Sequence, residues 1–569
     1  MLKRNILKMI CTVIILMLIV AGCGTGSTTN TSSSTETSKS EPSPQSTSTA
    51  APSSNSTLDN VNSAGIFPIV KKPITMKLAT VVNPSVENIK TNTSTLMLQD
   101  VSGINLDIIE LPSKDAMTKV NLMFASGDLP DIFTGLFYPK VALEGFIEAG
   151  KLAQLDEYIE EYGVGYKEFL GFLGNDAQIY KSIATFSDGH RYTLNIVNSA
   201  LSGVFSGFGS IYEPWLEKLG EKVPTTLEEF YNLMVRFKND DPNGNKKADE
   251  VPISGISTIA SRLISYIGNA YQYTDFTYRL SVKDGVVNFI ANNDLYKRTL
   301  MFMNKMCSEG LIDPLLFTQS NAELSATMAL EDLTVGTLIT PSISAFMNTT
   351  GERCRKFVPL PPLEGPDGYK TAYVRGLDVY HTYIITSNCK FPAAAYRLGD
   401  YLLSEEGNNL YRYGIKGKHW DKPDSGAVDS AGRPAYIKII DDIWGLTKQN
   451  VIWKNNAVPY LLDTRYEMRQ SKGNPYEYEA KKLAAALMMQ PHAPAEYVPA
   501  ALPYATTEDS VKVAELRTAI DEIVMEYSVQ FIVGDLSFDM WGNYVDALKK
   551  LGVDEYVELV QKNYDIVFK

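Results

Sequence analysis

The clearest chemical signal in this chain of 569 residues is a short run of oxygen donors at alternate positions between residues 241 and 250. Calcium is bound by six to eight oxygen atoms at about 2.3–2.6 Å, and a tight loop with a donor at every second position supplies most of them from one segment. The sequence therefore predicts a calcium loop with six ligands, the fourth through its main-chain carbonyl: Asp241, Asn243, Asn245, Lys247, Asp249 and Glu250.

The loop departs from the calcium loop of an EF-hand at two positions. An EF-hand has Gly at the sixth position and a bidentate Glu at the twelfth, whereas Lys246 and Pro252 stand there in this chain. The closing carboxylates come early, and because Pro252 biases the preceding residue out of the helical region, an extended segment is expected directly after them. Asp-Pro-Asn-Gly-Asn is also typical of a surface turn, which is the alternative interpretation.

A helix is expected on the near side of this loop. Thr226 and Glu229 have the spacing of a capping box, and apolar residues recur at helical spacing from Leu227 to Phe237. This helix would end directly before the predicted calcium loop. The loop would therefore connect a helix to a strand.

Between the N-terminal region and this helix, predicted strands alternate with predicted helices. Alternating apolar residues predict strands over 74–80 and 104–111, and a helical pattern over 117–124 ends at Gly127 before a short strand at 131–133. Such units build parallel sheets of α/β proteins, in which ligands bind beyond the carboxyl ends of the strands. The corner at 127–131 is therefore a candidate edge of a cleft.

The first 23 residues predict export. Three basic residues precede an apolar run over 9–20, which is shorter than the roughly 20 residues that a membrane span needs. The run ends in Val-Ala-Gly-Cys, so we expect residues 1–22 to be a signal peptide and Cys23 to be lipidated. The alternative is a chance Ala-Gly-Cys after a membrane anchor. No other segment is predicted to span a membrane.

Residues 23–65 are mostly Ser, Thr, Asn, Pro and small residues, a composition that buries too little apolar surface to fold. We expect a disordered tether with a reach of roughly 35 Å.

The net charge and the number of cysteines restrict the classes of protein to which this chain can belong. The formal net charge of −13 becomes −16 without residues 1–22, which carry three basic and no acidic residues. Such a surface repels nucleic acid. After Cys11 is removed and Cys23 acylated, an odd number of cysteines remains, namely Cys307, Cys354 and Cys389, which argues against a disulfide framework.

The common catalytic motifs are missing from the sequence. There is no GxSxG, HExxH, P-loop or strand-linked GxGxxG pattern, and the four His residues are scattered. A glycosidase-like pair of carboxylates stays open, because two such groups need only lie about 5–9 Å apart in space. The 32 Tyr and 5 Trp residues favour stacking on sugar rings. Trp215 and Trp541 are expected in the core, whereas Trp420 lies in a Gly-flanked loop where either role fits.

These residues resemble the lipid-anchored extracellular solute-binding proteins of family 1, in the group of alginate-oligosaccharide binders and LipO-type lipoproteins. The most specific landmarks are the loop at 241–252 and Gly-Ile-x-Gly-x-His-Trp at 414–420. Weaker ones are Ser-Gly-Asp-Leu-Pro-Asp at 126–131, Asp-Gly-x-x-Tyr at 188–192, 215–220 with 224–226, and Gly-Leu-Ile-Asp at 310–313. Together they cover nearly all of residues 66–569.

The resemblance implies an α/β protein with a type II periplasmic-binding-protein-like fold, in which two α/β lobes joined by crossover strands enclose a ligand cleft. We expect lobe 1 at about 66–195 plus 376–412 and lobe 2 at about 196–375, with 413–569 as a helical C-terminal part assigned to neither. It also implies structural Ca²⁺ on the six residues named above, although family loops often carry Gly where Lys246 stands. For the cleft we predict Tyr192, Arg375 and Trp420, which lie beside predicted strand ends or crossovers.

The leading hypothesis is a monomeric, non-enzymatic lipoprotein on the extracellular face of the cell membrane. It would capture a carbohydrate, an oligosaccharide above all, by hinge closure and deliver it to the permease subunits of an ABC importer. The alternatives are a surface polysaccharide hydrolase or lyase, a binding protein for a peptide or other polar solute, and a structural or sensory surface protein.

Overall fold

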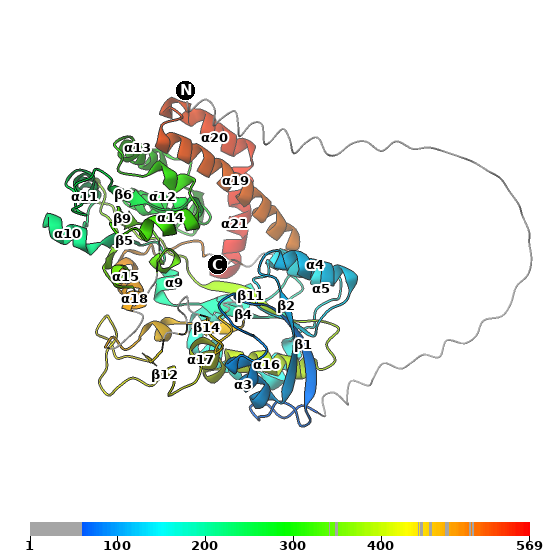
Figure 1. Ribbon diagram of the computed structural model, residues 1–569. Helices are drawn as coiled ribbons and strands as arrows, with labels where there is room; N and C mark the ends of the chain where they lie inside the picture. Colours follow the sequence, from blue (N-terminus) through cyan, green and yellow to red (C-terminus); the bar gives the residue numbers. More distant parts are fainter. Residues whose placement is uncertain are drawn as a thin grey trace, which may run out of the picture. The chain divides into compact units, whose positions relative to one another are not determined.

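The computed structural model describes residues 60–340, 342–347, 351–441, 443, 448–454, 458–472, 477–499, 502 and 506–569. They belong to one compact unit of the chain that contains two separate sheets, each covered by helices (Figure 1). The predicted signal peptide and Cys23 lie outside the described residues.

The first lobe is built on a six-stranded sheet in the order β14-β4-β11-β3-β1-β2. The strands β1, β2, β3, β4 and β14 run parallel to one another, and β11 runs antiparallel to its neighbours β3 and β4. Their bounds are β1 (Ile74–Val81), β2 (Ile104–Leu111), β3 (Ile132–Phe133), β4 (Thr193–Asn198), β11 (Asp378–Ile385) and β14 (Tyr460–Leu462).

Side chains of this sheet alternate between two apolar cores, one on each face. On β1, Leu78 belongs to one core and Ala79 to the other, and Ile132 and Phe133 of β3 divide in the same way. The helices of this lobe are α3 (Thr93–Ser102), α4 (Ala116–Ser126), α5 (Lys140–Glu148), α6 (Asp156–Tyr162), α7 (Val164–Leu173), α8 (Asp176–Ala184), α16 (Pro392–Leu403) and α17 (Glu405–Tyr413). Those packed on the Ala79 face are α4 and α5, and the others pack on the Leu78 face.

The second lobe is built on a four-stranded sheet in the order β10-β5-β9-β6. Here β6 and β9 are parallel, and β5 is antiparallel to both β9 and β10. The bounds are β5 (Gly209–Tyr212), β6 (Val251–Ser254), β9 (Val335–Leu338) and β10 (Phe357–Leu360). There are also two separate two-stranded sheets. One pairs β7 (Leu280–Lys283) with β8 (Val286–Phe289), and the other pairs β12 (Trp420–Asp421) with β13 (Lys438–Ile439).

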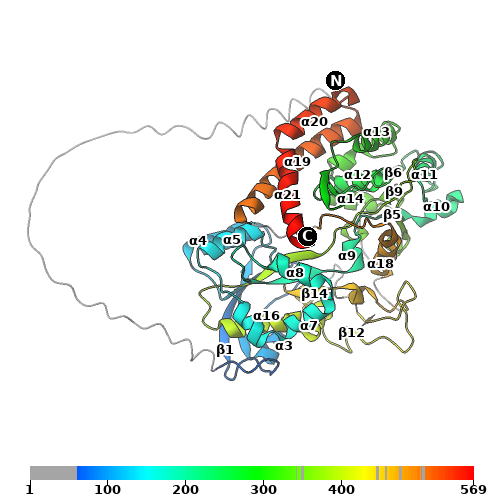
Figure 2. The same ribbon diagram turned by 180° about the vertical axis from the view of Figure 1, so that it is seen from behind.

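Helices of the second lobe come from the middle and from the end of the chain. They are α10 (Glu213–Leu219), α11 (Leu227–Asn239), α12 (Ala260–Gly268), α13 (Asp294–Ser308), α14 (Asn321–Met328), α15 (Glu352–Arg355), α18 (Glu477–Met489), α19 (Thr507–Val533), α20 (Trp541–Lys550) and α21 (Val553–Phe568). Most share one large core, in which α11 and α12 meet the C-terminal helices. Both ribbon views show the N-terminal end of α19 beside α4 and α5 of the first lobe (Figures 1 and 2), and α19 contacts α5.

Two crossover segments, which run next to each other, connect the two sheets. At the first sheet they leave from Asn198 and Asp378, which are paired partners on β4 and β11. At the second sheet they arrive at Gly209 and Leu360, which are paired partners on β5 and β10. The segment 199–208 carries the short helix α9 (Leu201–Val204), and the segment 361–377 runs beside it. The fold is the two-lobed α/β architecture that the sequence predicts.

Several details differ from the sequence-based expectations. Residues 60–65 were expected in the disordered tether, but Val61 is buried in the first core and bridges to Val70. The strand β4 reaches Asn198 in the first sheet, beyond the lobe boundary expected at 195. Residues 413–569, which were assigned to neither lobe, are divided between the two. The strand β14 joins the first sheet, and α18–α21 pack in the second lobe. The expected loop at 414–420 ends in the strand β12.

The three described cysteines, Cys307, Cys354 and Cys389, form no disulfide with one another. In the part of the chain that the structure describes, none of the helices combines the length with the apolar character that crossing a membrane requires.

The packing of α16 on the first sheet predicts opposite effects for two helical glycines. A Cβ atom at Gly399 of α16 would lie 2.6 Å from Cδ1 of Leu194 and 2.9 Å from Cε1 of Tyr383. We expect Gly399→Ala to lower the free energy of unfolding by about 1–3 kcal/mol, because the helix cannot approach the sheet as closely. Urea denaturation measures this change.

Gly171→Ala is the matched control in the same lobe. Gly171 lies exposed on α7, and a Cβ atom there would meet nothing within 4 Å. The substitution should raise the free energy of unfolding by about 0.5–1 kcal/mol, because Ala loses less backbone entropy than Gly in a helix. Equal effects of the two substitutions would contradict the close packing of α16.

Candidate functional site

Two arginines lie at the junction of the lobes, one on a crossover segment and one on α12. Arg375 donates from its main-chain nitrogen to the carbonyl of Val204 at 2.8 Å, which ties the two segments together. Its guanidinium donates to Oδ1 of Asp378 at 2.6 Å and to the hydroxyl of Tyr380 at 2.9 Å. Arg262, on α12 of the second lobe, donates to the carbonyl of Ser206 at 2.9 Å. Both arginines are half-buried.

Aromatic rings from both lobes lie beside these arginines. The rings of Phe276 and Tyr373 have centroids 4.1 Å apart, and the guanidinium of Arg262 lies 4.3 Å from the centroid of the Phe276 ring. In the first lobe, Phe137 and Tyr380 have ring centroids 4.9 Å apart. Phe137 is 50 % exposed and follows the carboxyl end of β3. We call these side chains the crossover cluster: Arg262, Arg375, Asp378, Phe137, Phe276, Tyr373 and Tyr380.

The charges in this cluster act on one another. Burial, and to a smaller extent the positive charge of Arg375, lowers the pKa of Arg262 to about 10. Burial likewise raises the pKa of Asp378, although Arg375 opposes this shift. Arg375 is ion-paired with Asp378, and Arg262 lies near enough for its charge to act on that carboxylate, so the cluster keeps positive hydrogen-bond donors next to exposed ring surface.

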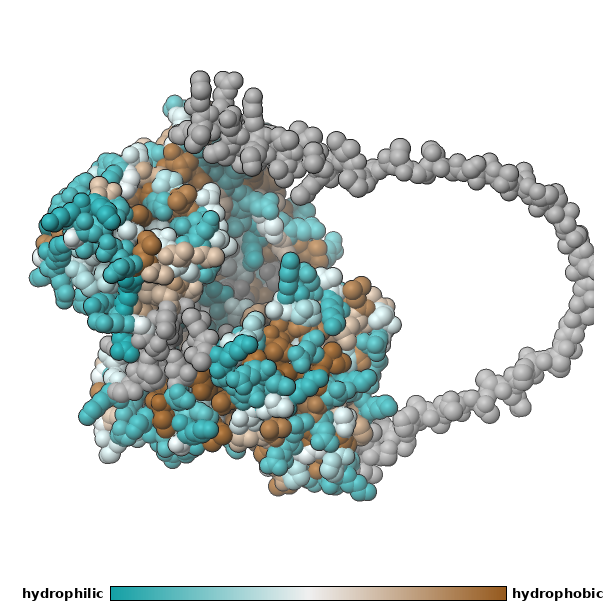
Figure 3. All heavy atoms as spheres, in the orientation of Figure 1, coloured by the Kyte–Doolittle hydropathy of each residue, from teal (hydrophilic) through white to brown (hydrophobic). Residues whose placement is uncertain are grey.

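The surface between the two lobes is hollowed in the space-filling view (Figure 3). Carboxyl ends of the parallel strands β3 and β4 lead to this junction, the position where α/β sheets bind ligands. Exposed aromatic faces beside a few fixed polar groups can hold an uncharged polar ligand that has ring surfaces of its own.

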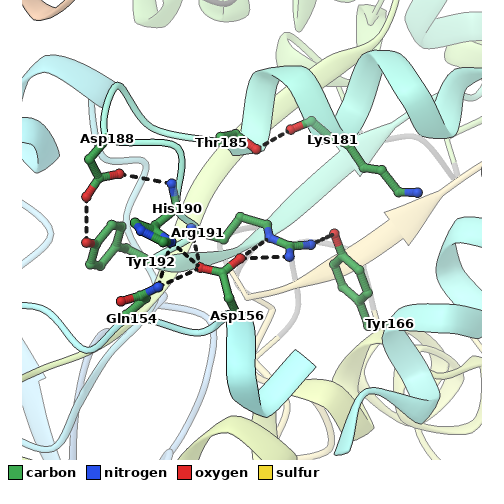
Figure 4. A network of polar contacts seen from close by, with 9 residues as sticks. All are labelled: Gln154, Asp156, Tyr166, Lys181, Thr185, Asp188, His190, Arg191 and Tyr192. Atoms are coloured by element: carbon green, nitrogen blue, oxygen red, sulfur yellow. Dashed lines mark hydrogen bonds and ion pairs between the residues drawn. The ribbon is translucent and has the colours of Figure 1, made fainter. Parts of the chain in front are cut away.

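Of the three predicted cleft residues, only Arg375 belongs to the crossover cluster. Tyr192 precedes β4, at the amino end of that strand and therefore at the opposite edge of the sheet. It is 9 % exposed, and its hydroxyl donates to Oδ2 of Asp188 at 2.7 Å. The network around it continues through Arg191, whose Nε donates to Oδ1 of Asp156 at 2.8 Å (Figure 4). Its contacts give Tyr192 a structural role.

Trp420 lies on β12 in the first lobe, away from the crossover cluster. Its indole nitrogen donates to the carbonyl of Gly414 at 3.0 Å, and its half-buried ring packs against the small core of β13. It lines a cavity of about 1230 Å³ beside α17, to which no member of the crossover cluster contributes. The structure therefore does not bring Tyr192, Arg375 and Trp420 together.

Sequence reasoning missed Phe137, Tyr380, Arg262 and Phe276. Phe137 carried a usable signal, because it follows the predicted strand at 131–133 and its corner at 127–131 was already a candidate cleft edge. Tyr380 lies close to Arg375 in the chain, whereas Arg262 and Phe276 come from distant segments that only the fold brings to the junction.

The predicted calcium loop connects α11 to β6, as the sequence indicates. Asp241, Gly244 and Lys246 all have positive φ, of 48°, 79° and 65°. Lys246 thus adopts the left-handed conformation that Gly takes more easily. Its main-chain nitrogen donates to both carboxylate oxygens of Asp241, at 3.2 and 3.3 Å.

The side chains of this loop that are predicted to bind calcium already face one another. The amide nitrogens of Asn243 and Asn245 donate to Oδ1 of Asp249 at 3.1 and 3.2 Å. Glu250 is buried, and its Oε1 has no hydrogen-bond partner among the described residues. Burial raises the pKa of Glu250, and the nearby charges of Asp249 and Asp241 add to that shift. One buried carboxylate with an unpartnered oxygen, next to two partly exposed carboxylates, fits a cation.

No group of three or more His, Cys, Asp or Glu side chains that could hold a metal ion occurs among the described residues. In the loop, amide groups of Asn243 and Asn245 occupy the space next to Asp249. The oxygens of these two amides accept hydrogen bonds from the main-chain nitrogens of Asn245 and Lys247, at 2.9 and 2.8 Å.

The family model for bacterial extracellular solute-binding proteins matches residues 98–409. Among curated proteins, the fructooligosaccharide ABC transporter substrate-binding protein FusA of Streptococcus pneumoniae is 25 % identical over 535 residues, covering 88 % of this chain and 91 % of FusA. Lipoprotein LipO of Bacillus subtilis is 21 % identical over 485 residues, covering 82 % of this chain and 88 % of LipO.

Solved structures share the fold. FusA in complex with kestose has a TM-score of 0.71 at 23 % identity, covering 87 % of this chain and 99 % of that one. An EF-hand mutant of FusA with fructo-nystose has a TM-score of 0.70 at 22 % identity, covering 87 % and 99 %. The alginate-binding protein AlgQ2 without calcium ion has a TM-score of 0.60 at 19 % identity, covering 87 % and 99 %.

Proposed function

Because this chain belongs to the bacterial extracellular solute-binding protein family, we propose that it captures an oligosaccharide outside the cell and delivers it to the membrane subunits of an ABC importer. The ligand would bind in the crossover cluster. The names of FusA and AlgQ2, which state fructooligosaccharide and alginate, support a saccharide as the ligand class.

The single observation that carries this proposal is the crossover cluster itself. Exposed faces of Phe137 and of the half-buried Phe276 suit the C–H faces of sugar rings, and the guanidinium groups of Arg262 and Arg375 donate to hydroxyl or carboxylate oxygens. With two arginines and one carboxylate, the cluster has a formal charge of +1, so a neutral or weakly acidic saccharide suits it better than a cation.

Binding would proceed by closure of the two lobes about the paired crossovers. Residues of the cluster come from both sides, since Phe137 and Tyr380 belong to the first lobe and Arg262 to the second. Closure would press these groups onto the ligand and exclude water from the hydrogen bonds, which strengthens them.

We infer binding without turnover. Glycoside hydrolysis uses two carboxyl groups on either side of the scissile bond. In the crossover cluster the carboxylate is Asp378, which Arg375 holds at 2.6 Å in an ion pair. An ion-paired carboxylate of this kind orients a guanidinium group and is a poor general acid.

The exposed ring of Phe137 provides a test of the cleft. A thermal-shift screen against fructo-, galacturono-, alginate and milk oligosaccharides would first identify a ligand, since a ligand at 100 times its Kd adds about 2.7 kcal/mol to stability. Phe137→Ala should then weaken binding of that ligand at least tenfold, because a ring face at the junction is lost. Isothermal titration measures the change.

Phe172→Ala is the matched control, because Phe172 is also a partly exposed phenylalanine of the first lobe but lies on α7. It should leave the affinity unchanged. Equal affinities of wild type and Phe137→Ala would remove the crossover cluster from the binding site. Release of shortened sugars during the titration would favour an enzyme instead.

Structural Ca²⁺ in the loop at 241–250 is the second part of the proposal. Asp241, Asn243, Asn245, the carbonyl of Lys247, Asp249 and Glu250 would hold the ion, which would neutralise the three carboxylates and tie the end of α11 to the start of β6. The EF-hand mutant of FusA and the calcium-free AlgQ2 support a calcium site in relatives.

Removal of the ion should destabilise the protein. We expect a chelator to lower the melting temperature of the wild type, because the carboxylates of the loop would then repel one another. Asp249→Ala should lower it without chelator and make the protein insensitive to chelator. The affinity can be modest, since extracellular calcium sites work at about 10⁻⁴–10⁻³ M.

Asp332→Ala, at an exposed aspartate of the same lobe, is the control and should keep the full response to chelator. Identical melting curves of the wild type with and without chelator, together with no calcium in elemental analysis, would rule out the calcium proposal.

Lipidation of Cys23 completes the proposal. It would anchor the protein on the extracellular face of the cell membrane, with the residues that follow as a tether. The support is the Val-Ala-Gly-Cys sequence after a short apolar run, together with the name of LipO as a lipoprotein.

Cys23→Ala should move the protein from the membrane fraction to the medium, because the acyl chains would be lost. Fractionation followed by immunoblotting measures this shift. Cys307→Ala is the control, since that cysteine lies within the folded second lobe. A Cys23→Ala protein that stays in the membrane fraction at the wild-type level would point to another anchor.

A further inference from the structure

The cavity beside α17 is a second concave site of the first lobe, and the proposed function does not use it. It has a volume of about 1230 Å³ and lies between α17, the N-terminal end of α7 and the segment that carries β12 and β13. We call it the α17 cavity. It shares no lining residue with the crossover cluster.

Its apolar lining is rich in aromatic rings. Phe67 is 43 % exposed and meets Tyr401 edge to face, with ring centroids 5.4 Å apart. Trp420 and Tyr436 line the cavity from the β12–β13 side. Such rings offer flat apolar faces that fit the C–H faces of a sugar.

Polar groups line the cavity as well. Asn409 is 5 % exposed and lines it from α17, and its buried Oδ1 accepts no hydrogen bond in the described part of the chain. Tyr401, on α16, is also 5 % exposed and lines the cavity. A side-chain amide and a phenolic hydroxyl can each bond the hydroxyl groups of a sugar.

The deep charged groups, in contrast, are already paired within the protein. Asp400 accepts from the main-chain nitrogens of Val164, Gly165 and Tyr166 at 3.1, 2.9 and 2.8 Å. Arg397 donates to the carbonyls of Asn62 and Ile66 at 2.7 and 2.8 Å. The main chain thus already uses hydrogen-bonding groups of both side chains, which leaves fewer of them for an ionic ligand.

Charges on the rest of the lining are mixed. Acidic and basic side chains both line the cavity: Glu168, Glu405, Glu406 and Asp424 with Lys416 and Lys422. Lys438 holds Asp424 at 2.8 Å, and the hydroxyl of Tyr436 hydrogen-bonds to Glu405, which joins the two walls. This rim selects neither an anion nor a cation strongly.

From these observations we propose that the α17 cavity is a second binding site, which takes one or a few rings of a neutral, hydroxyl-rich saccharide. Asn409 and Tyr401 would bond its hydroxyl groups, and Trp420 and Phe67 would contact its ring faces. The site would work independently of lobe closure, because all these residues belong to the first lobe.

Tryptophan fluorescence of the full chain tests the proposal, with Phe137→Ala as the background that weakens the crossover cluster. Glucose, galactose, fructose and kestose are titrated to millimolar concentrations. We expect at least one of them to cause a saturable change in emission. Trp420→Phe should abolish this change, because Trp420 is the tryptophan that lines the cavity.

Asn409→Leu should weaken the binding behind this signal at least tenfold. Tyr401→Phe, which removes only the hydroxyl and keeps the ring contact with Phe67, should weaken it severalfold and remains informative if Asn409→Leu does not fold. Lys418→Ala is the control, since Lys418 is exposed on the same loop but does not line the cavity. It should leave the titration unchanged.

The proposal is overturned if none of the four sugars causes a saturable change, or if Asn409→Leu and Tyr401→Phe bind as tightly as their parent. It is also overturned if Phe137→Ala alone removes the Trp420 signal, because Trp420 would then report on the junction of the lobes. Failure of the crossover proposal would give a different result. The ligand from the thermal-shift screen would still bind tightly to the Phe137→Ala protein, and the Trp420 signal would persist.

Discussion

Antiparallel pairing of β4 with β11 is the interaction on which the rest of this structure depends. It places Asn198 opposite Asp378, so that both crossover segments leave the first sheet at one point. The pairing of Gly209 with Leu360 receives them together at the second sheet. Because neighbouring strands lie only about 5 Å apart, the two connections stay adjacent, and the lobes can move about one short junction.

That junction explains why the proposed binding groups are where they are. Arg375 sits on one crossover and bonds to the carbonyl of Val204 on the other, while Arg262 reaches the same place from α12. A group fixed to the junction moves little when the lobes close, so Arg375 can orient a ligand. Phe137, on the first lobe, is the kind of contact that closure would complete.

Regions with structural roles differ from candidate ligand sites in whether their buried polar groups have hydrogen-bond partners. Around Tyr192, hydroxyl, guanidinium and carboxylate groups are paired with one another (Figure 4). Glu250 in the loop at 241–250 and Asn409 beside the α17 cavity each keep a buried oxygen without a partner among the described residues. Buried polar groups cost free energy unless they are paired, so such exceptions indicate where an ion or a ligand belongs.

Local patterns in the sequence by themselves determined many of the elements and the position of the loop at 241–250. Period-two apolar residues predict β1 and β2, the capping box of Thr226 and Glu229 predicts α11, and the calcium donors lie within ten consecutive residues, so chain geometry alone keeps them close. Only the tertiary structure decided which residues form the crossover cluster. Phe137, Arg262 and Tyr380 come from separate parts of the chain, and the fold brings a loop after β3, the helix α12 and the strand β11 to one junction. Tyr192 and Trp420 show the converse, because being near a strand end does not say which edge of the sheet that end occupies; the direction and order of the strands decide it.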